Sequence, residues 1–358
     1  MTTELLSIYK IQNGMVLADD VFNDSAQLIV PKGVTISDTI IDKLKYYHID
    51  AVTVYKEGTA ATDSSAPMTH SQRVRESAEF RAYSQVFYEK NEEFHYQLNE
   101  IAEKNADISV NKLFETTNDI LSTADSSYRV FDMLHNMRHF DDSTYAHSLN
   151  VSIIANIMGK WLGLNEEDIK ILTVAGLLHD IGKLLIPQEI ITKPGKLTEQ
   201  EYTMIKNHPL LGYNLLCKQA MDPRISQAAL FHHEKCDGSG YPLGRTGNDL
   251  PAIAKIITIV DIYEAMTANR VYRHGLCPFE VIRTFESEGF QKYDPKYILV
   301  FLKGIVQTYI NETVELNDGR AGEIVLINEQ SPANPMIKIG TDFVDLNKHP
   351  DLYIVNIL

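Results

Sequence analysis

A single acidic residue inside an apolar segment restricts how this chain can fold. After Leu250-Pro251, apolar residues recur at helical spacing from Ile253 to Ile262, and Asp261 is the lone acid among them. Burying an unpaired carboxylate costs on the order of several kcal/mol. We therefore expect the fold to bring a cation to Asp261, either a basic side chain or a metal ion.

A His-Asp pair follows another apolar helical segment. Asn165 is the predicted N-cap of this segment, which leads into His179-Asp180-Ile181-Gly182-Lys183. The pair offers a neutral imidazole and a carboxylate that can bridge two cations. Lys183 is predicted to lie on about the same face as His179, where it would meet a phosphate. Taken alone, the pair also fits an aspartate that orients a histidine or caps the next turn.

Further histidines stand at the ends of other predicted helices. His232-His233 runs into a turn from Asp237 to Pro242 that cannot continue a helix. His208 stands just before a proline, after a helix that begins at a capping box over residues 198–201. His147 stands just before another amphipathic run, from Val151 to Leu162. An adjacent histidine pair at a helix end is, by itself, as consistent with solvated side chains as with ligands.

Together these segments supply seven nitrogen and oxygen ligands with no thiolate among them. Such a set suits iron, manganese or another metal that accepts imidazole and carboxylate, and it exceeds what one tetrahedral ion requires. Two metals close together are typical of phosphoester hydrolysis. The set is His147, His179, Asp180, His208, His232, His233 and Asp261.

The order of these residues resembles the motif string of HD-GYP phosphodiesterases, a branch of the HD metal-dependent phosphohydrolase superfamily, over about residues 144–306. The resemblance implies an all-helical domain that hydrolyses the bacterial second messenger cyclic di-GMP to linear pGpG or onward to GMP. It also implies that the seven residues hold two divalent metal ions, iron or manganese, with Asp180 bridging them. A hydroxide between the metals would then attack phosphorus.

The resemblance also assigns roles around the metals. Asp180 and Lys183 become the catalytic residues. Arg270 and Arg273 are three apart and share a face, which fits phosphate recognition, although the spacing alone fits a surface pair equally well. The implied substrate-binding residues are Lys183, Asp237, Gly240, Tyr241, Pro242, Arg270 and Arg273.

One position departs from part of the family. Some members carry a glutamate four residues before the first histidine and are thought to hold a third metal with it, whereas Ser143 stands at that place here. A neutral hydroxyl is a poor ligand for such a cation, so we predict a two-metal centre. Two alternatives stay open: a receptor that binds cyclic di-GMP without cleaving it, and a hydrolase of another cyclic dinucleotide or of a mononucleotide phosphate.

The rest of the chain predicts a mainly α protein with small β-containing ends. Residues 1–57 are predicted to form a small α+β module, with strands over 15–18, 27–30 and 51–55 and a helix from Ser37 to Leu44. A linker over 58–69 leads to a helical connector over 70–140, which is compatible with a homodimer. The catalytic domain spans 141–310, and a β-rich appendix over 311–358 has strands at 313–316, 322–326, 336–339 and 353–355.

Charge and composition exclude several classes of protein. The formal net charge of −15 argues against general binding of a nucleic-acid polymer, which needs clustered Lys and Arg, but not against a small anionic ligand in a pocket. Three cysteines without CxxC spacing indicate neither a disulfide framework nor a thiolate zinc site. There is no apolar run long enough to cross a bilayer and no signal-like N-terminus, so we expect a cytoplasmic protein.

Overall fold

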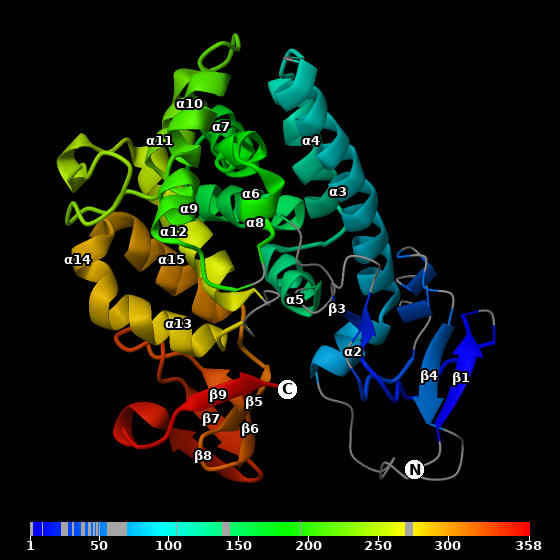
Figure 1. The fold of residues 1–358 in the computed structure, drawn as a ribbon. Helices are drawn as coiled ribbons and strands as arrows, with labels where there is room; N and C mark the ends of the chain where they lie inside the picture. The colour runs from blue at the N-terminus through cyan, green and yellow to red at the C-terminus, as the bar shows by residue number, and fades with distance from the viewer. Residues whose placement is uncertain are drawn as a thin grey trace. The chain divides into compact units, whose positions relative to one another are not determined.

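The chain forms two compact units, Met1–Met68 and Thr69–Leu358. In this computed structural model the described residues are 3–8, 10–22, 28–30, 32–36, 40–41, 44–45, 47, 49, 51–55, 70–104, 106–137, 144–193, 195–268 and 275–358. Helices dominate the second unit, and short strands lie near both ends of the chain, which confirms the predicted mainly α class (Figure 1). Within the described ranges, no helix is both long and apolar enough to cross a membrane.

The first unit contains two small antiparallel pairs of strands. Strand β1 (Thr3–Ser7) pairs with β4 (Ala51–Tyr55), and β2 (Val21–Phe22) pairs with β3 (Leu28–Val30). The strand predicted over 15–18 is wrong, because Val16 and Leu17 form only isolated bridges there, and β1 was not predicted. A helix was predicted from Ser37 to Leu44. Residues 40–41 and 44–45 are helical, whereas 37–39 and 42–43 lie outside the described residues.

The stretch predicted to be a helical connector contains four helices among its described residues. They are α2 (His70–Glu76), α3 (Ala78–Lys104), α4 (Val110–Leu121) and α5 (Ser127–Met137). The aromatic residues of α3 at helical spacing, including Tyr83, Phe87 and Phe94, are buried in the core, as their periodicity predicted.

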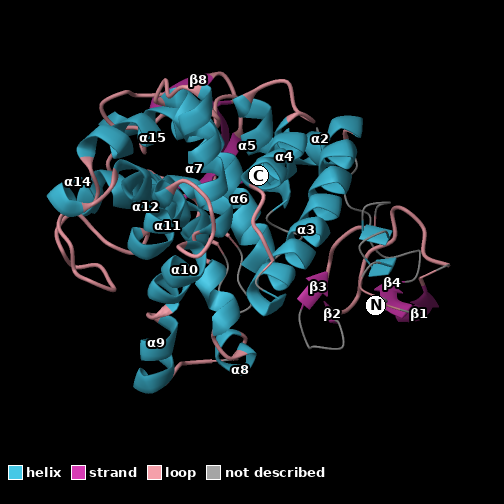
Figure 2. Cartoon of the chain, turned by 90° about the horizontal axis from the view of Figure 1, so that it is seen from above, coloured by secondary structure: helices cyan, strands magenta, loops and turns pink. Residues whose placement is uncertain are grey.

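The next helices surround the site. They are α6 (Thr144–Trp161), α7 (Glu166–Leu178), the 3-10 helix η1 (Ile181–Leu185), α8 (Gln188–Ile191), α9 (Glu199–Ile205), α10 (His208–Leu216), α11 (Pro223–Phe231), the 3-10 turn η2 (Gly247–Asp249) and α12 (Ala252–Thr267). The predicted N-cap at Asn165 and the capping box of Thr198 with Glu201 are both present. Helices α6 and α7 are buried along most of their length, and α8 and α9 project from the helical body (Figure 2).

The second unit ends in a small sheet. Helix α13 (Pro278–Thr284), the π-helical turn η3 (Phe285–Gly289), α14 (Phe290–Lys292) and α15 (Pro295–Gln307) lead into it. Its antiparallel strands have the order β8-β7-β6-β5-β9, and β9 contacts α13. The strands are β5 (Thr313–Leu316), β6 (Ala321–Leu326), β7 (Met336–Ile339), β8 (Asp342–Asp345), which precedes the 3-10 turn η4 (Leu346–Lys348), and β9 (Ile354–Ile357). Four of them match the predicted strands, and β8 was not predicted.

Candidate metal centre

The fold brings all seven predicted ligands together from five separate segments of the chain. Asp180, His208, His232 and His233 form one group, and His147, His179 and Asp261 form a second. In each group, one ligand atom from every residue lies within 4.8 Å of the others. Six of the seven are buried; the exception, His233, has a side chain that is 23% exposed. Asp261 was expected to lie beside a cation. In the structure it lies among histidines, with Nε2 of His147 3.1 Å from its Oδ1, and these side chains could hold a metal ion.

Asp180 lies between the two groups and presents one oxygen to each. Its Oδ1 is 3.1 Å from Nε2 of His208 and 3.6 Å from Nε2 of His232. Its Oδ2 is 3.4 Å from Nε2 of His179 and 3.6 Å from Nε2 of His147. A carboxylate in this position is placed to contact two cations at once.

Backbone carbonyls fix the tautomers of three histidines. Nδ1 of His179 donates to the carbonyl of Gly176 at 2.7 Å, Nδ1 of His208 to that of Ile205 at 2.7 Å, and Nδ1 of His232 to that of Ala229 at 2.8 Å. A carbonyl oxygen can only accept, so each Nδ1 carries a proton and each neutral ring turns the lone pair of Nε2 toward the centre. This is the arrangement of a histidine prepared to bind metal.

The inward-facing atoms do not satisfy one another. Nε2 of His208 and Nε2 of His232 lie 3.1 Å apart, and with both protons on Nδ1 two lone pairs face each other. Among the described residues, Nε2 of His179 and Oδ1 of Asp180 are buried without a hydrogen-bond partner. Buried polar atoms of this kind are rare unless an ion or water satisfies them. The donor set therefore fits divalent cations.

The ionisation states leave His232 and His233 neutral and Asp180 ionised, whereas His147 is protonated at neutral pH. Burial lowers the pKa of His232 to about 4 and that of His233 well below its usual value. Burial opposes ionisation of Asp180, yet the charge of Lys183 and the contacts with His179 and His208 hold its pKa well below the usual range. Burial also lowers the pKa of His147, but Glu264 and Asp261 outweigh it and raise this pKa to about 9. A cation binding at His147 must displace that proton.

Comparison with known proteins identifies this part of the chain. The model of the HD domain family matches residues 129–297, a range that contains all seven residues. Residues 129–297 form an HD domain.

Individual relatives agree with this assignment. A cyclic di-GMP phosphodiesterase of Pseudomonas aeruginosa is 33% identical over 201 residues, which cover 56% of this chain and 48% of the relative. The 3'3'-cGAMP-specific phosphodiesterase 1 of Vibrio cholerae is 38% identical over 154 residues, which cover 40% of this chain and 34% of the relative. The chain thus spans about half the length of these curated relatives, or less.

A solved structure shares the fold. An HDG"Y"P protein from Bdellovibrio bacteriovorus superposes with a TM-score of 0.55 at 13% sequence identity, covering 86% of this chain and all of that one (100%).

Lys183 reaches the HD domain centre by contacting Asp180. Its ammonium group contacts Oδ2 of Asp180, three residues earlier, and Nε2 of His179 lies 3.4 Å from the same oxygen. Lys183 meets Asp180 because α7 ends at Leu178 and residues 181–185 form a 3-10 helix, in which residues three apart align. The side chain of Lys183 is 24% exposed, so it lies at the accessible rim of the site.

A glycine allows η1 to cross α10 closely enough to form the centre. A Cβ on Gly182 would lie 2.0 Å from the carbonyl oxygen of His208 and 2.6 Å from the backbone nitrogen of Gly212. Both are backbone atoms, so a side chain at this position would push α10 away. The close crossing is what places Asp180 beside His208.

The loop over residues 237–242 packs against the second histidine of the His232-His233 pair. The ring of Tyr241 stacks on that of His233 with centroids 4.6 Å apart, and the peptide bond between Tyr241 and Pro242 is cis. A Cβ on Gly240 would lie 2.4 Å from Cα of Glu234, so only glycine fits there. The Asp237 carboxylate accepts hydrogen bonds from the backbone and hydroxyl of Ser239. The other predicted substrate contacts, Arg270 and Arg273, lie outside the described residues.

Two buried glutamates support the site, and sequence reasoning missed both roles. Glu264 accepts the Nδ1 proton of His147 and also a hydrogen bond from Asn150 at 3.0 Å. Glu234 accepts the backbone N–H groups of Leu243 at 2.6 Å and Arg245 at 3.0 Å, which ties down the far end of the loop. Glu264 stands three residues after Asp261 on one helix, and that spacing was the available signal.

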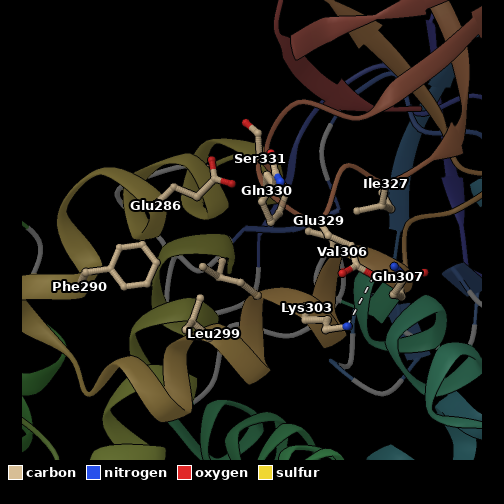
Figure 3. A pocket seen from close by; sticks show the side chains of 12 residues that line it. Glu286, Phe290, Leu299, Lys303, Val306, Gln307, Ile327, Glu329, Gln330 and Ser331 are labelled. Atoms are coloured by element: carbon tan, nitrogen blue, oxygen red, sulfur yellow. Dashed lines mark ion pairs between the residues drawn. The ribbon is translucent and has the colours of Figure 1, made fainter.

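A separate cavity of about 410 Å³ opens between α15 and the β6–β7 connection (Figure 3). Its lining includes Phe290, Leu299 and Ile327, and Lys303 pairs with Glu329 at its edge at 3.5 Å. None of the lining residues belongs to the histidine cluster. The cavity therefore has no part in the chemistry of the HD domain centre.

Proposed function

We propose that this protein is a metal-dependent phosphodiesterase that hydrolyses cyclic di-GMP to pGpG, GMP or both. The observation that carries the proposal is Asp180, whose two oxygens face two groups of buried imidazoles. The Pseudomonas relative, named as a cyclic di-GMP phosphodiesterase, supports this choice of substrate. Two ions, iron or manganese, are proposed because each group offers a separate set of nitrogen and carboxylate ligands.

The metal ions would bind at His147, His179, Asp180, His208, His232, His233 and Asp261. Bound divalent cations supply an activated water at neutral pH and withdraw charge from a phosphodiester. Asp180 stays ionised for this role, because Lys183 and the histidines keep its pKa low. His147 carries a proton that a bound cation would displace, because Glu264 and Asp261 raise its pKa to about 9.

The rim of the site is where the substrate would bind. Lys183, His233 and Tyr241 are partly exposed, whereas the rest of the cluster is closed. We propose that the Lys183 ammonium turns from Asp180 to a phosphate oxygen once cations neutralise that carboxylate. Tyr241 and the loop held by Glu234 would then close one side of the ligand. Arg270 and Arg273 stay predicted phosphate contacts.

A second cyclic dinucleotide is a specific alternative. The Vibrio relative is named as specific for 3'3'-cGAMP, and its identity of 38% over the matched region is above that of the Pseudomonas relative at 33%. The two substrates share the phosphodiester ring and differ in one base. The metal cluster treats them alike, so the choice between them depends on base contacts around the rim.

Chromatography of the reaction products tests the proposal. Iron- or manganese-loaded protein is incubated with cyclic di-GMP and, separately, with 3'3'-cGAMP, and linear products are resolved from the cyclic forms. We expect pGpG or GMP from cyclic di-GMP, none from His179→Ala, and normal turnover from His349→Ala, which changes an exposed histidine of the C-terminal sheet region. Binding without cleavage by well-metallated protein would establish the receptor alternative instead. The cytoplasmic location and the homodimer stay predictions.

A further inference from the structure

A second cluster of metal-capable side chains lies outside the HD domain centre. It consists of His70, the first residue of α2, Asp132 in α5, and Glu312 just before β5. Asp132 and Glu312 are each only 3% exposed, and the side chain of His70 is 18% exposed. Three segments that are distant in sequence thus meet at one partly closed point of the second unit.

The contacts are those of ligands that converge on one point. Nε2 of His70 lies 3.1 Å from Oδ1 and 3.0 Å from Oδ2 of Asp132, and 3.4 Å from Oε1 of Glu312. One ligand atom from each residue lies within 4.8 Å of the other two. Neighbouring ligands of one ion, bound at about 2.1 Å each and at right angles, are separated by about 3 Å.

An ion pair between His70 and Asp132 does not account for the third member. Oε2 of Glu312 is buried without a hydrogen-bond partner among the described residues. Burial and the neighbouring Asp132 carboxylate raise the pKa of Glu312 to about 8, although His70 and Arg73 act in the opposite direction. Asp132 and Glu312 thus place two acidic groups side by side in the interior, an arrangement that a bound cation stabilises.

The backbone around Glu312 holds its side chain in this place. Asn311 has a φ of 71°, in the left-handed region, and its N–H donates to the carbonyl of Ile324. The N–H of Glu312 donates to Tyr309, and its carbonyl accepts from Ile324 at 3.0 Å. These contacts fix the position of the Glu312 backbone, and its side chain is buried there.

We propose that His70, Asp132 and Glu312 bind one divalent transition-metal ion, separate from the ions of the HD domain. One imidazole and two carboxylates suit manganese, iron, nickel or zinc better than calcium or magnesium, which prefer oxygen ligands alone. The ion would neutralise both carboxylates and use the unsatisfied oxygen. It would also fasten the start of the helical connector to α5 and to the beginning of the C-terminal sheet.

Metal content and anomalous scattering test this site in the full chain. Zinc bound at equilibrium is counted for the unmodified protein, for Glu312→Gln and for Glu288→Gln, whose side chain is 57% exposed. We expect Glu312→Gln to bind one ion fewer per chain and Glu288→Gln to bind the full number. In zinc-soaked crystals, an anomalous peak should appear within about 2.2 Å of Nε2 of His70.

Two results would overturn the site. One is equal zinc content in the unmodified protein and in folded Glu312→Gln. The other is a map with peaks at the HD domain cluster and none at His70. If Glu312→Gln fails to fold, the map of the unmodified protein decides the question alone. These experiments measure the number and position of bound ions. Their outcome does not depend on whether the HD domain cleaves a cyclic dinucleotide.

Discussion

Oε2 of Glu264 accepts the Nδ1 proton of His147, although the two residues stand 117 positions apart in the chain. Glu264 is 1% exposed, and Asn150 holds its other oxygen, so the carboxylate is fixed before any ligand arrives. A carboxylate on the outer nitrogen of a histidine orients the ring and makes its inner nitrogen a stronger ligand.

Glu264→Gln should therefore weaken metal binding at His147. The amide keeps the size of the side chain but removes its charge, and we expect the affinity for manganese to fall about 10- to 100-fold. Titration at a pH near 9, close to the pKa of His147, limits competition from its proton. Exposed Glu288→Gln is the control, and equal affinities for all three proteins would contradict the orienting role.

Lys183→Met should impair turnover without removing metal. The substitution keeps most of the aliphatic packing and removes the ammonium group that contacts Asp180. We expect kcat/KM for cyclic di-GMP to fall about 100-fold, because a positioned charge on the transferring phosphate is lost. The metal content should not decrease. Lys160→Met, on the exposed end of α6, is the matched control, and unchanged kinetics in Lys183→Met would show that this lysine does not contact substrate.

Gly182→Ala should disrupt the crossing of η1 with α10. The new methyl group would meet two backbone atoms within 2.6 Å, so we expect a loss of about 2 kcal/mol or more in the free energy of unfolding, together with reduced metal content. Gly159→Ala in α6 is the control, since its nearest neighbours are the side chains of Ile169 and Leu172 at 3.1 and 3.3 Å. Urea unfolding of both variants measures the difference, and similar losses would argue against the crossing.

The stability of the protein should also carry a pH-dependent contribution from Glu286. Burial raises its pKa above the ordinary 4.5, while the N–H of Ala333 and the charge of Arg283 act to lower it. Between 4.5 and the raised value the folded chain binds more protons than the unfolded chain. This contribution is therefore full below pH 4.5 and is lost as pH rises through the folded pKa.

Glu286→Gln keeps an acceptor for Ala333 and removes the titration. We expect the variant to gain stability relative to the unmodified protein as pH rises from about 5 to 8, by on the order of 0.5 kcal/mol, because partial exposure screens the effect. Urea unfolding at both pH values measures it. If the variant and the unmodified protein differ in free energy of unfolding by the same amount at about pH 5 and pH 8, Glu286 does not titrate in this range.

Local patterns in the sequence predicted much of the centre. Helical periodicity placed the helices, and the predicted ligand residues lie together in the structure as a cluster of metal-capable side chains. Charged edge strands were harder: β8 has aspartates at both ends and lies at the edge of its sheet, so its sequence lacks the alternation of a buried strand. The contact of Lys183 with Asp180, three residues earlier, was not predicted, because periodicity does not distinguish a 3-10 turn from an α-helix.

Contacts between residues that are distant in the sequence could not be predicted from such local patterns. His70, Asp132 and Glu312 are single polar residues in unrelated segments, and only the packing of α2, α5 and β5 brings them together. The sequence shows where Glu234 and Glu264 stand but not which groups they contact. Their supporting roles could not be predicted, because the role of a buried acid depends on those contacts. Sequence spacing reports neighbours within one helix, whereas these groups meet between elements.

The three carbonyls that hold His179, His208 and His232 all belong to the last turn of the helix that precedes each ring. Carbonyls in a final helical turn have no partner within the helix, so each imidazole satisfies a group that every helix leaves exposed. The orientation of each ring is therefore set within four consecutive residues, from the one that supplies the carbonyl to the histidine itself. It follows that an incoming cation meets rings whose rotational entropy was already lost when the helices formed, and that the same short segment could be moved to the end of another helix with its ring orientation intact.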